Sequence, residues 1–208
     1  MFSLSAMMLF IGASVLLILV PGPDLIFTVT QGITNGRKAG VMTAIGLSLG
    51  NTVHTLAAAL GLSIIVQTSA TVFTVFKVAG ACYLFYLAYQ SFIHRKDRSV
   101  LAGASKQQGF RLLFKGMTMN VLNPKVAIFF LAFLPQFVNY SYGYVPLQMI
   151  VLGVVFMVLT AIIFGLLGYF AGVFNRRLLH SDRFNEWLAC GASAIFVLLG
   201  IKLITTKA

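Results

Sequence analysis

Acidic residues are nearly absent from this chain. Only 4 of the 208 residues are aspartate or glutamate, against 15 lysines and arginines, and charged residues together make up 9% of the sequence. Hydrophobic residues make up 59%. A soluble domain does not need that much apolar surface, so the composition predicts an integral membrane protein that forms a single domain over residues 1–208.

Cysteine is also scarce. The two cysteines, Cys82 and Cys190, both lie in apolar runs, and the sequence holds no CxxC or Cys/His cluster. A disulfide framework, a metal site or a cofactor is therefore not expected. The net charge of +11 would suggest nucleic acid as the partner of a soluble chain. In a membrane chain it follows from basic cytoplasmic loops, so the expected partners are membrane lipid and a small molecule, with no nucleic acid.

Long apolar runs dominate what is present. A helix needs roughly 20 apolar residues to cross the hydrocarbon core. Six segments meet this length, at about 4–30, 39–66, 70–93, 110–138, 145–173 and 185–205. The polar linker at about 94–109 separates two halves of three spans each, about 4–93 and 110–205. The expected fold class is an all-α integral membrane protein with six transmembrane helices.

Basic residues are distributed unequally over the connections between these spans. The second and fourth connections have none, and the first, third and fifth have the following: Arg37, Lys38, Arg95, Lys96, Arg98, Lys106, Arg111, Lys115, Arg176, Arg177 and Arg183. The excess of basic residues in cytoplasmic loops places these three connections inside the cell and both termini outside. The tyrosines at 140, 142 and 144 then fit an outer aromatic belt.

Two apolar runs are interrupted by proline beside a charge. The first interruption is Pro21-Gly22-Pro23-Asp24, and the second is Asn123-Pro124-Lys125. A bilayer core cannot satisfy a freed backbone group or an isolated charge, so such breaks persist only where protein buries them or where they line a cavity. Matched interruptions in two halves of a membrane chain indicate the binding site of a transporter.

The two halves resemble each other. Pro23-Asp24 and Pro124-Lys125 are offset by 101 residues, and a second match aligns 80–85 with 191–196. Because each half has an odd number of spans, the pattern predicts two three-helix repeats inverted in the membrane.

Asp24 and Lys125 are opposite charges expected within the membrane. Such charges are costly there and need a partner or a water-filled cavity. A purely structural ion pair between the halves is one interpretation. The other is a substrate site, in which Asp24 receives an amine, Lys125 receives a carboxylate, and the backbone groups at the breaks assist both. Together these would suit a zwitterion such as a free amino acid.

Polar residues continue from the breaks along three helices. Thr28 and Gln31 share a face with Asp24, Asn120 precedes Asn123 by one turn, and a stripe in the second span comprises Ser48, Asn51, His54 and Thr55. Hydrogen bonding between helices is the simpler interpretation. A shared polar cavity is the alternative, in which Thr28, Asn51, His54 and Lys77 are candidates for lining it or for proton coupling.

The sequence contains two GxxxG motifs, Gly46/Gly50 and Gly168/Gly172, which allow two helix backbones to approach closely. They would serve either packing within one subunit or a homodimer.

These residues carry a family resemblance. VPGPD at 20–24, GRKAG at 36–40, FKVAGACYLFYLAYQ at 76–90 and MNVLNPKVAIFFLAFLPQF at 119–137 resemble the lysine-exporter family, and within it the homoserine/threonine-efflux (RhtB-type) branch. The resemblance covers nearly the whole chain. It implies an exporter of amino acids or close derivatives driven by the proton gradient, with the signature positions at Pro21, Gly22, Pro23, Asp24, Asn123, Pro124 and Lys125. It favours Asp24 as a reader of the substrate's amine over an obligatory proton carrier.

Other classes remain open on the residues alone. A membrane thiol-redox carrier would use Cys82 and Cys190, which fall in comparable parts of the two halves, and an intramembrane hydrolase would need a serine near His54. A channel or metal-ion exporter would need more acids and histidines than the chain has. A non-enzymatic exporter is the preferred interpretation.

Overall fold

A computed structural model describes residues 2–62, 70–93 and 109–173, together with single helical residues between 190 and 205. Within these residues the chain is helical throughout, joined by short turns. Most of the expected linker at 94–109 and much of the expected span at 185–205 lie outside the described residues.

The first expected span is two helices. α1 (Leu4–Leu19) and α2 (Pro23–Asn35) are bent by 60° at the break between them. Proline is favoured at the first position of a helix, where its missing N–H is not needed, and Pro23 opens α2 in this way. Gly36 ends α2 with a φ of 85°, a left-handed conformation that glycine adopts without cost, and the chain reverses there into the next helix.

The fourth expected span is broken in the same way. α6 (Phe110–Val121) is followed by α7 (Pro124–Ile128), which continues as a π-helical segment η4 (Phe129–Phe133) and a 3₁₀ segment η5 (Leu134–Phe137). The bend between Phe110–Val121 and Pro124–Phe137 is 51°. Pro124 opens α7 as Pro23 opens α2.

The remaining helices are less interrupted. They are α3 (Arg37–Leu56) with its π-helical extension η1 (Ala57–Leu62), α5 (Ala70–Ile93), the short turn η6 (Tyr140–Tyr142) and α8 (Val145–Val173). α5 and α8 have the bounds expected from the sequence. Among the described helices, α8 alone is long and apolar enough to cross a membrane, and the two bent pairs raise the number of candidate spans to three if each pair is one span. Among the described residues the fold is thus an all-helical membrane protein with several candidate spans, two of them broken at proline.

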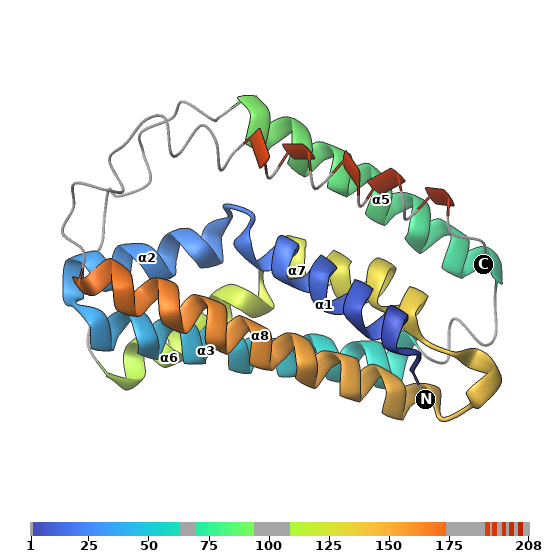
Figure 1. Cartoon of the computed structure of the whole chain (residues 1–208), viewed down its shortest axis with the longest axis horizontal. Helices are drawn as coiled ribbons and strands as arrows, with labels where there is room; N and C mark the ends of the chain where they lie inside the picture. The colour runs from blue at the N-terminus through green and yellow to red at the C-terminus, as the bar shows by residue number, and fades with distance from the viewer. Residues whose placement is uncertain are drawn as a thin grey trace.

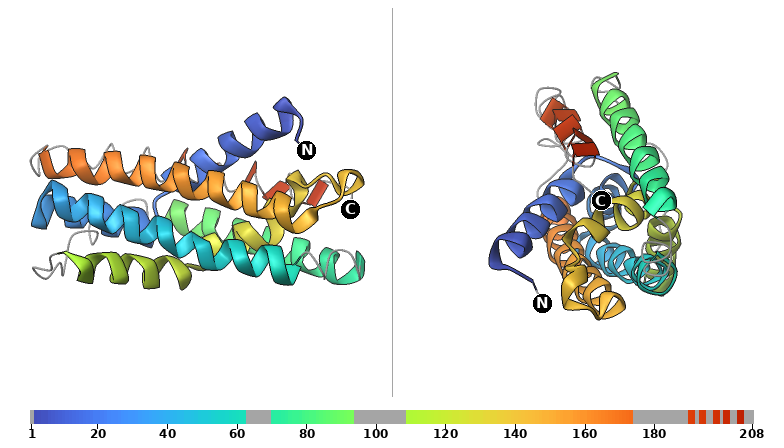
Figure 2. Two further views of the ribbon diagram at one scale, coloured as in Figure 1. Left: turned by 90° about the horizontal axis from the view of Figure 1, so that it is seen from below. Right: turned by 90° about the vertical axis from the view of Figure 1, so that its right-hand side faces the viewer.

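α3 occupies the centre of the helix packing, with α8, α6 and α2 against it. α3 and α8 run side by side along the long axis (Figures 1 and 2). Their backbones meet where a Cβ atom on Gly40 would lie 2.5 Å from the carbonyl oxygen of Gly168. A Cβ atom on Gly46 would collide with the carbonyl oxygen of Leu113 in α6. Both GxxxG motifs therefore serve packing within one chain, and this packing gives no support to a dimer.

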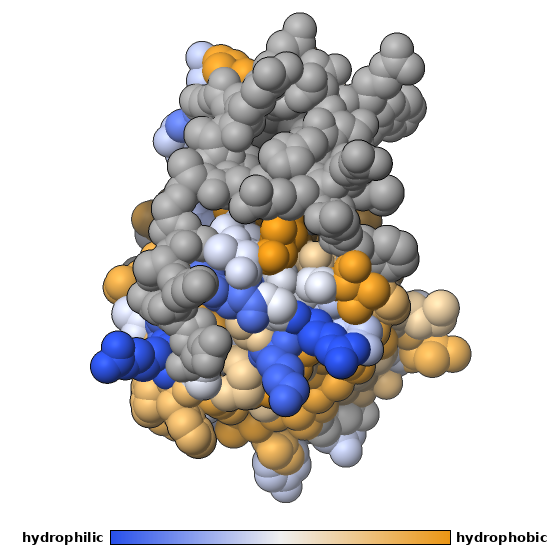
Figure 3. Space-filling model, turned by 90° about the vertical axis from the view of Figure 1, so that its left-hand side faces the viewer, coloured by the Kyte–Doolittle hydropathy of each residue, from blue (hydrophilic) through white to orange (hydrophobic). Residues whose placement is uncertain are grey.

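Basic residues gather at one end of the molecule. Arg37 and Lys38 lie where α2 meets α3, Arg111 and Lys115 lie at the start of α6, and all four are exposed. Figure 3 views this end and shows hydrophilic residues above an apolar girdle. The Arg37 guanidinium lies 5.7 Å from the centre of the Tyr169 ring. The first expected connection and the C-terminal end of the third therefore lie at the same end of the molecule, as the distribution of basic residues predicts.

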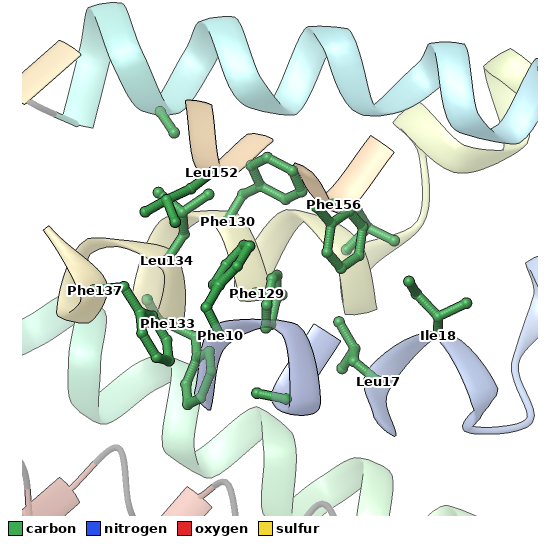
Figure 4. Close-up of a cluster of buried hydrophobic side chains, with 14 of the residues drawn as sticks. Phe10, Leu17, Ile18, Phe129, Phe130, Phe133, Leu134, Phe137, Leu152 and Phe156 are labelled. Atoms are coloured by element: carbon green, nitrogen blue, oxygen red, sulfur yellow. The ribbon is translucent and has the colours of Figure 1, made fainter. Parts of the chain in front are cut away.

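An aromatic cluster fills the core on the other side of the two breaks (Figure 4). Phe129 and Phe133 of η4 point toward Phe10 of α1, and Phe156 of α8 lies against the same group. The Phe129 and Phe156 rings are 5.0 Å apart, and the Phe10 and Phe137 rings are 5.2 Å apart and edge-on. Aromatic pairs favour such offset or edge-to-face contacts, so this cluster closes the core tightly.

Candidate functional site

Lys125 lies across the first break although it belongs to the second. Its ammonium donates hydrogen bonds to the carbonyl oxygens of Leu17 and Val20, both at 3.1 Å. Leu17 would normally bond to the N–H of the residue four positions later, but that residue is Pro21, which has none. A cation is also favourable at the negative end of α1. Lys125 thus caps a helix that the proline left incomplete, and it is 5% exposed.

Gly22 permits this approach. A Cβ atom at Gly22 would lie 3.3 Å from the Lys125 Nζ, a tighter contact than most side chains make. The φ of Gly22 is −161°, an extended conformation that any residue adopts. Space for the lysine, and not backbone freedom, is therefore the reason for a glycine here.

Asp24 lies in the first turn of α2 and is 1% exposed. Its Oδ2 accepts a hydrogen bond of 2.9 Å from the Asn120 side chain of α6, and its Oδ1 is buried with no partner. The positive end of α2 stabilises the carboxylate. Within the described part of the chain no ion pair joins Asp24 to Lys125. The alternative interpretation as a purely structural ion pair therefore does not hold, and each charge has its own partners.

His54 of α3 forms a hydrogen bond to the backbone at the second break. Its Nε2 lies 3.1 Å from the backbone oxygen of Asn120. That oxygen would normally bond to the N–H of residue 124, which is a proline. A carbonyl oxygen can only accept, so the histidine must carry its proton on Nε2 in this contact. The Asn123 N–H also donates to this oxygen at 2.9 Å, so His54 adds a second donor to a carbonyl whose usual helical donor the proline removed.

The two breaks face one small cavity. Asp24, Asn120 and Lys125 line it, together with Thr160 of α8. The cavity has a volume of about 10 Å³, which is about the room that one water molecule needs. Asn120 Oδ1 and Asp24 Oδ1 are both buried without a hydrogen-bond partner. Buried polar atoms in native proteins are normally paired, so these two acceptors indicate a place where a donor binds.

The other predicted site residues surround the cavity without lining it. Pro21, Gly22, Pro23 and Pro124 form the breaks. Asn123 caps α7, because its side-chain oxygen accepts the Lys125 N–H at 3.0 Å. The Lys77 side chain lies outside the described residues.

The two remaining candidates make structural hydrogen bonds. Thr28 donates to the Asp24 carbonyl of its own helix at 2.8 Å. Asn51 donates to Thr160 at 3.2 Å, which links α3 to α8. Thr28 and Asn51 are both fully buried, so hydrogen bonds within and between helices account for most of the polar stripes.

The contribution of α8 was not predicted from the sequence. Phe156, Thr160 and Phe164 line the cavity from this helix. A signal for it exists, because Thr160 is the one polar side chain between Gln148 and Tyr169. An isolated polar residue in the middle of an apolar span usually faces the protein interior.

Fold and site together define a multi-pass membrane protein with a buried, oppositely charged site between broken helices, an arrangement typical of transporters. The family model for LysE type translocators matches residues 15–207. The chain belongs to this family, whose members are transporters and not enzymes, which sets aside the redox-carrier and hydrolase alternatives.

Individual relatives agree with this assignment. An uncharacterized membrane protein of Pseudomonas aeruginosa is 34% identical, over 92% of this chain and 91% of the relative. An uncharacterized membrane protein of Bacillus subtilis is 27% identical, over 95% and 97%. A leucine efflux protein of an Enterobacter species is 31% identical over 60% of each chain. No solved structure matches the chain.

Proposed function

We propose that this protein is a secondary active exporter of amino acids or close derivatives across the cytoplasmic membrane. One observation carries the proposal: Asp24 and Lys125 line the same buried cavity, and Asp24 keeps an unpaired carboxylate oxygen. A zwitterion presents an ammonium and a carboxylate a short distance apart, which matches this pair. Leucine efflux proteins among the relatives support an amino-acid substrate.

The substrate's amine binds Asp24 in this proposal. The free Asp24 Oδ1 and the free Asn120 Oδ1 accept its protons, because both are buried acceptors without a partner. Lys125 receives the carboxylate. Two of its three N–H groups are bonded to α1 carbonyls, so one is left for a ligand and the others exchange partners as the site opens.

The small size of the cavity requires a conformational change for binding. A volume of about 10 Å³ cannot hold an amino acid, so the two broken helices must separate. Alternating access through rocking of two halves provides this. The halves, about 4–93 and 110–205, form one transporter domain of six spans in two inverted repeats. The equivalent positions of Pro23 and Pro124, each opening a helix just after a bend, support the repeat.

Orientation and coupling complete the proposal. The exposed basic residues at one end support a cytoplasmic location for that end, with both termini outside. The proton gradient drives export, and Asp24 or His54 exchanges the proton.

Export from cells loaded with a dipeptide tests the proposal. Cells that express the protein should release the liberated amino acid faster than control cells, and a protonophore should abolish the difference. Asp24→Asn keeps an acceptor for the Asn120 amide but removes the charge, so it should fold and lose at least about tenfold of the export rate. Leu166→Ala, on the exposed face of α8, is the matched control and should export normally.

The outcomes separate the parts of the proposal. Undiminished export by a folded Asp24→Asn variant excludes Asp24 as the amine site. Export that persists with a protonophore excludes proton coupling. No release of any amino acid by the wild-type protein rejects the function.

A further inference from the structure

The cavity wall has a polar side and an apolar side. The polar side consists of Asp24, Asn120 and Lys125. The rest of the wall is apolar except for Thr160, and its residues come from α1, α7 and α8: Leu17, Ile18, Val126, Phe156 and Phe164. All five are at most 3% exposed. An amino acid held by its two charges on the polar side must therefore direct its side chain against this apolar wall.

The α8 part of that wall offers no hydrogen-bond donor. Phe156, Thr160 and Phe164 are spaced four residues apart and so share one face of the helix. The Thr160 hydroxyl donates to the Phe156 carbonyl at 2.8 Å and accepts the Asn51 amide at 3.2 Å. Its proton is committed within its own helix. A hydroxyl on the substrate side chain would find no donor on this face.

A cationic side chain on the substrate would also find no partner in the cavity wall. Asp24 is the one acid among the described residues that line the cavity, and it is assigned to the α-amine. The whole chain has only 4 acids, the other three being Asp97, Asp182 and Glu186. Burying a cationic side chain against phenylalanine and leucine, without an acid to pair with it, is costly.

We infer that the apolar wall is a side-chain subsite, formed by Phe156 and Phe164 of α8 with Leu17 and Ile18 of α1, that selects amino acids with uncharged aliphatic side chains. The inference rests on the proposed export of amino acids and narrows its substrate class. Phe164 is the specificity residue best suited to testing, because Phe156 also packs against Phe129 and Phe130 in the aromatic cluster.

The full chain in proteoliposomes provides the test. Counterflow is measured separately with labelled leucine, threonine and lysine, each with the unlabelled amino acid inside. Leucine should exchange at half-saturating concentrations at least about tenfold lower than threonine or lysine. An apolar pocket rejects an added hydroxyl by about 100-fold at most, and burying the unpaired lysine ammonium costs more. Threonine or lysine exchanging as well as leucine overturns the subsite while leaving amino-acid export intact. No counterflow with any amino acid rejects both.

A substitution locates the subsite. Phe164→Ala enlarges the wall, so half-saturation for leucine should rise about tenfold relative to that for the bulkier phenylalanine. Leu166→Ala, two residues away and 53% exposed, should leave the ratio unchanged. An unchanged ratio in Phe164→Ala overturns the assignment of α8 to the subsite. If that variant does not fold, the wild-type comparison of the three amino acids decides alone.

Discussion

The two proline breaks solve the same problem with different chemistry. In each, a proline removes the N–H that the carbonyl four residues earlier would have used, Leu17 in the first break and Asn120 in the second. Lys125 supplies the missing donor in the first break. In the second break, the Asn123 N–H and His54 Nε2 both donate to the Asn120 carbonyl oxygen. The charged Lys125 of the second break thus braces the first break, and His54 of α3 helps to brace the second.

The difference bears on which charge is free to act. Lys125 has two partners from α1 and holds the broken helix together. Asp24 has one partner, the Asn120 amide, and one unpaired oxygen. Buried polar atoms are normally satisfied, so the unpaired Asp24 oxygen marks the first break. The cation of the second break is used to brace the first.

Lys125→Met should produce the largest effect. It removes the donor to two α1 carbonyls and leaves the buried Asp24 carboxylate without a nearby cation. Breaking a buried charge arrangement from one side costs about 3–5 kcal/mol, and export should be lost. Unfolding by denaturant in detergent micelles measures the change. Lys115→Met, at an exposed position, is the control. The contrast between the breaks fails if Lys125→Met is as stable as the wild type.

Asn120→Ala should come next. It removes the one hydrogen bond to the Asp24 carboxylate, and hydrogen bonds to charged groups contribute about 1.5–3 kcal/mol. Asn123→Ala is the matched variant one turn later. It removes only the cap of α7, which costs about 1 kcal/mol. The same unfolding measurement compares them. Equal losses in the two variants would mean that Asn120 adds nothing beyond an ordinary cap.

The sequence predicted the breaks better than the contacts at them. Proline and charge inside an apolar run identify a break because both are intolerable in lipid, and Asp24, Asn120 and Lys125 do share a cavity. The interpretation that Asp24 and Lys125 form an ion pair does not match the structure, in which Lys125 bonds to backbone carbonyls. An ammonium has three donors, and the pattern of residues could not show that the carbonyls of Leu17 and Val20 at the first break would take two of them.

α8 escaped prediction for a related reason. Its apolar residues are uniform enough that no face stands out from the sequence, and lipid and protein interior favour the same side chains. Only Thr160 distinguished one face. Which phenylalanines accompany it into the cavity follows from the packing of α8 on α3, which close-approaching glycines such as Gly40 and Gly168 set.

His54→Leu and His54→Gln separate bracing from proton coupling. Leucine leaves the Asn120 carbonyl oxygen with the Asn123 N–H as its donor, so stability should fall by about 0.5–1.5 kcal/mol, the net value of one hydrogen bond. Glutamine restores an N–H donor but cannot carry a proton. If His54 only braces the second break, the glutamine variant should regain both stability and proton-driven export, measured in the dipeptide-loaded cells. Stability without proton-driven export in this variant would instead assign His54 to coupling.

Gly22→Ala should have the smallest effect on stability. It tests whether Lys125 needs the space that a glycine leaves at position 22. The backbone at Gly22 is extended, so an alanine adds no strain there, and its Cβ would lie 3.3 Å from the Lys125 Nζ. The lysine must shift by a few tenths of an ångström, which lengthens its two bonds to α1 and should cost about 0.5–1 kcal/mol. Gly12→Ala, in α1 with no heavy atom within 4 Å of the added Cβ, should instead be neutral or stabilising by up to about 1 kcal/mol, because alanine is the better helix former. Opposite signs in the unfolding free energies of these two variants indicate that the first break is built around the lysine of the second. A Gly22→Ala variant that is stabilised like Gly12→Ala would show that Lys125 does not depend on this approach.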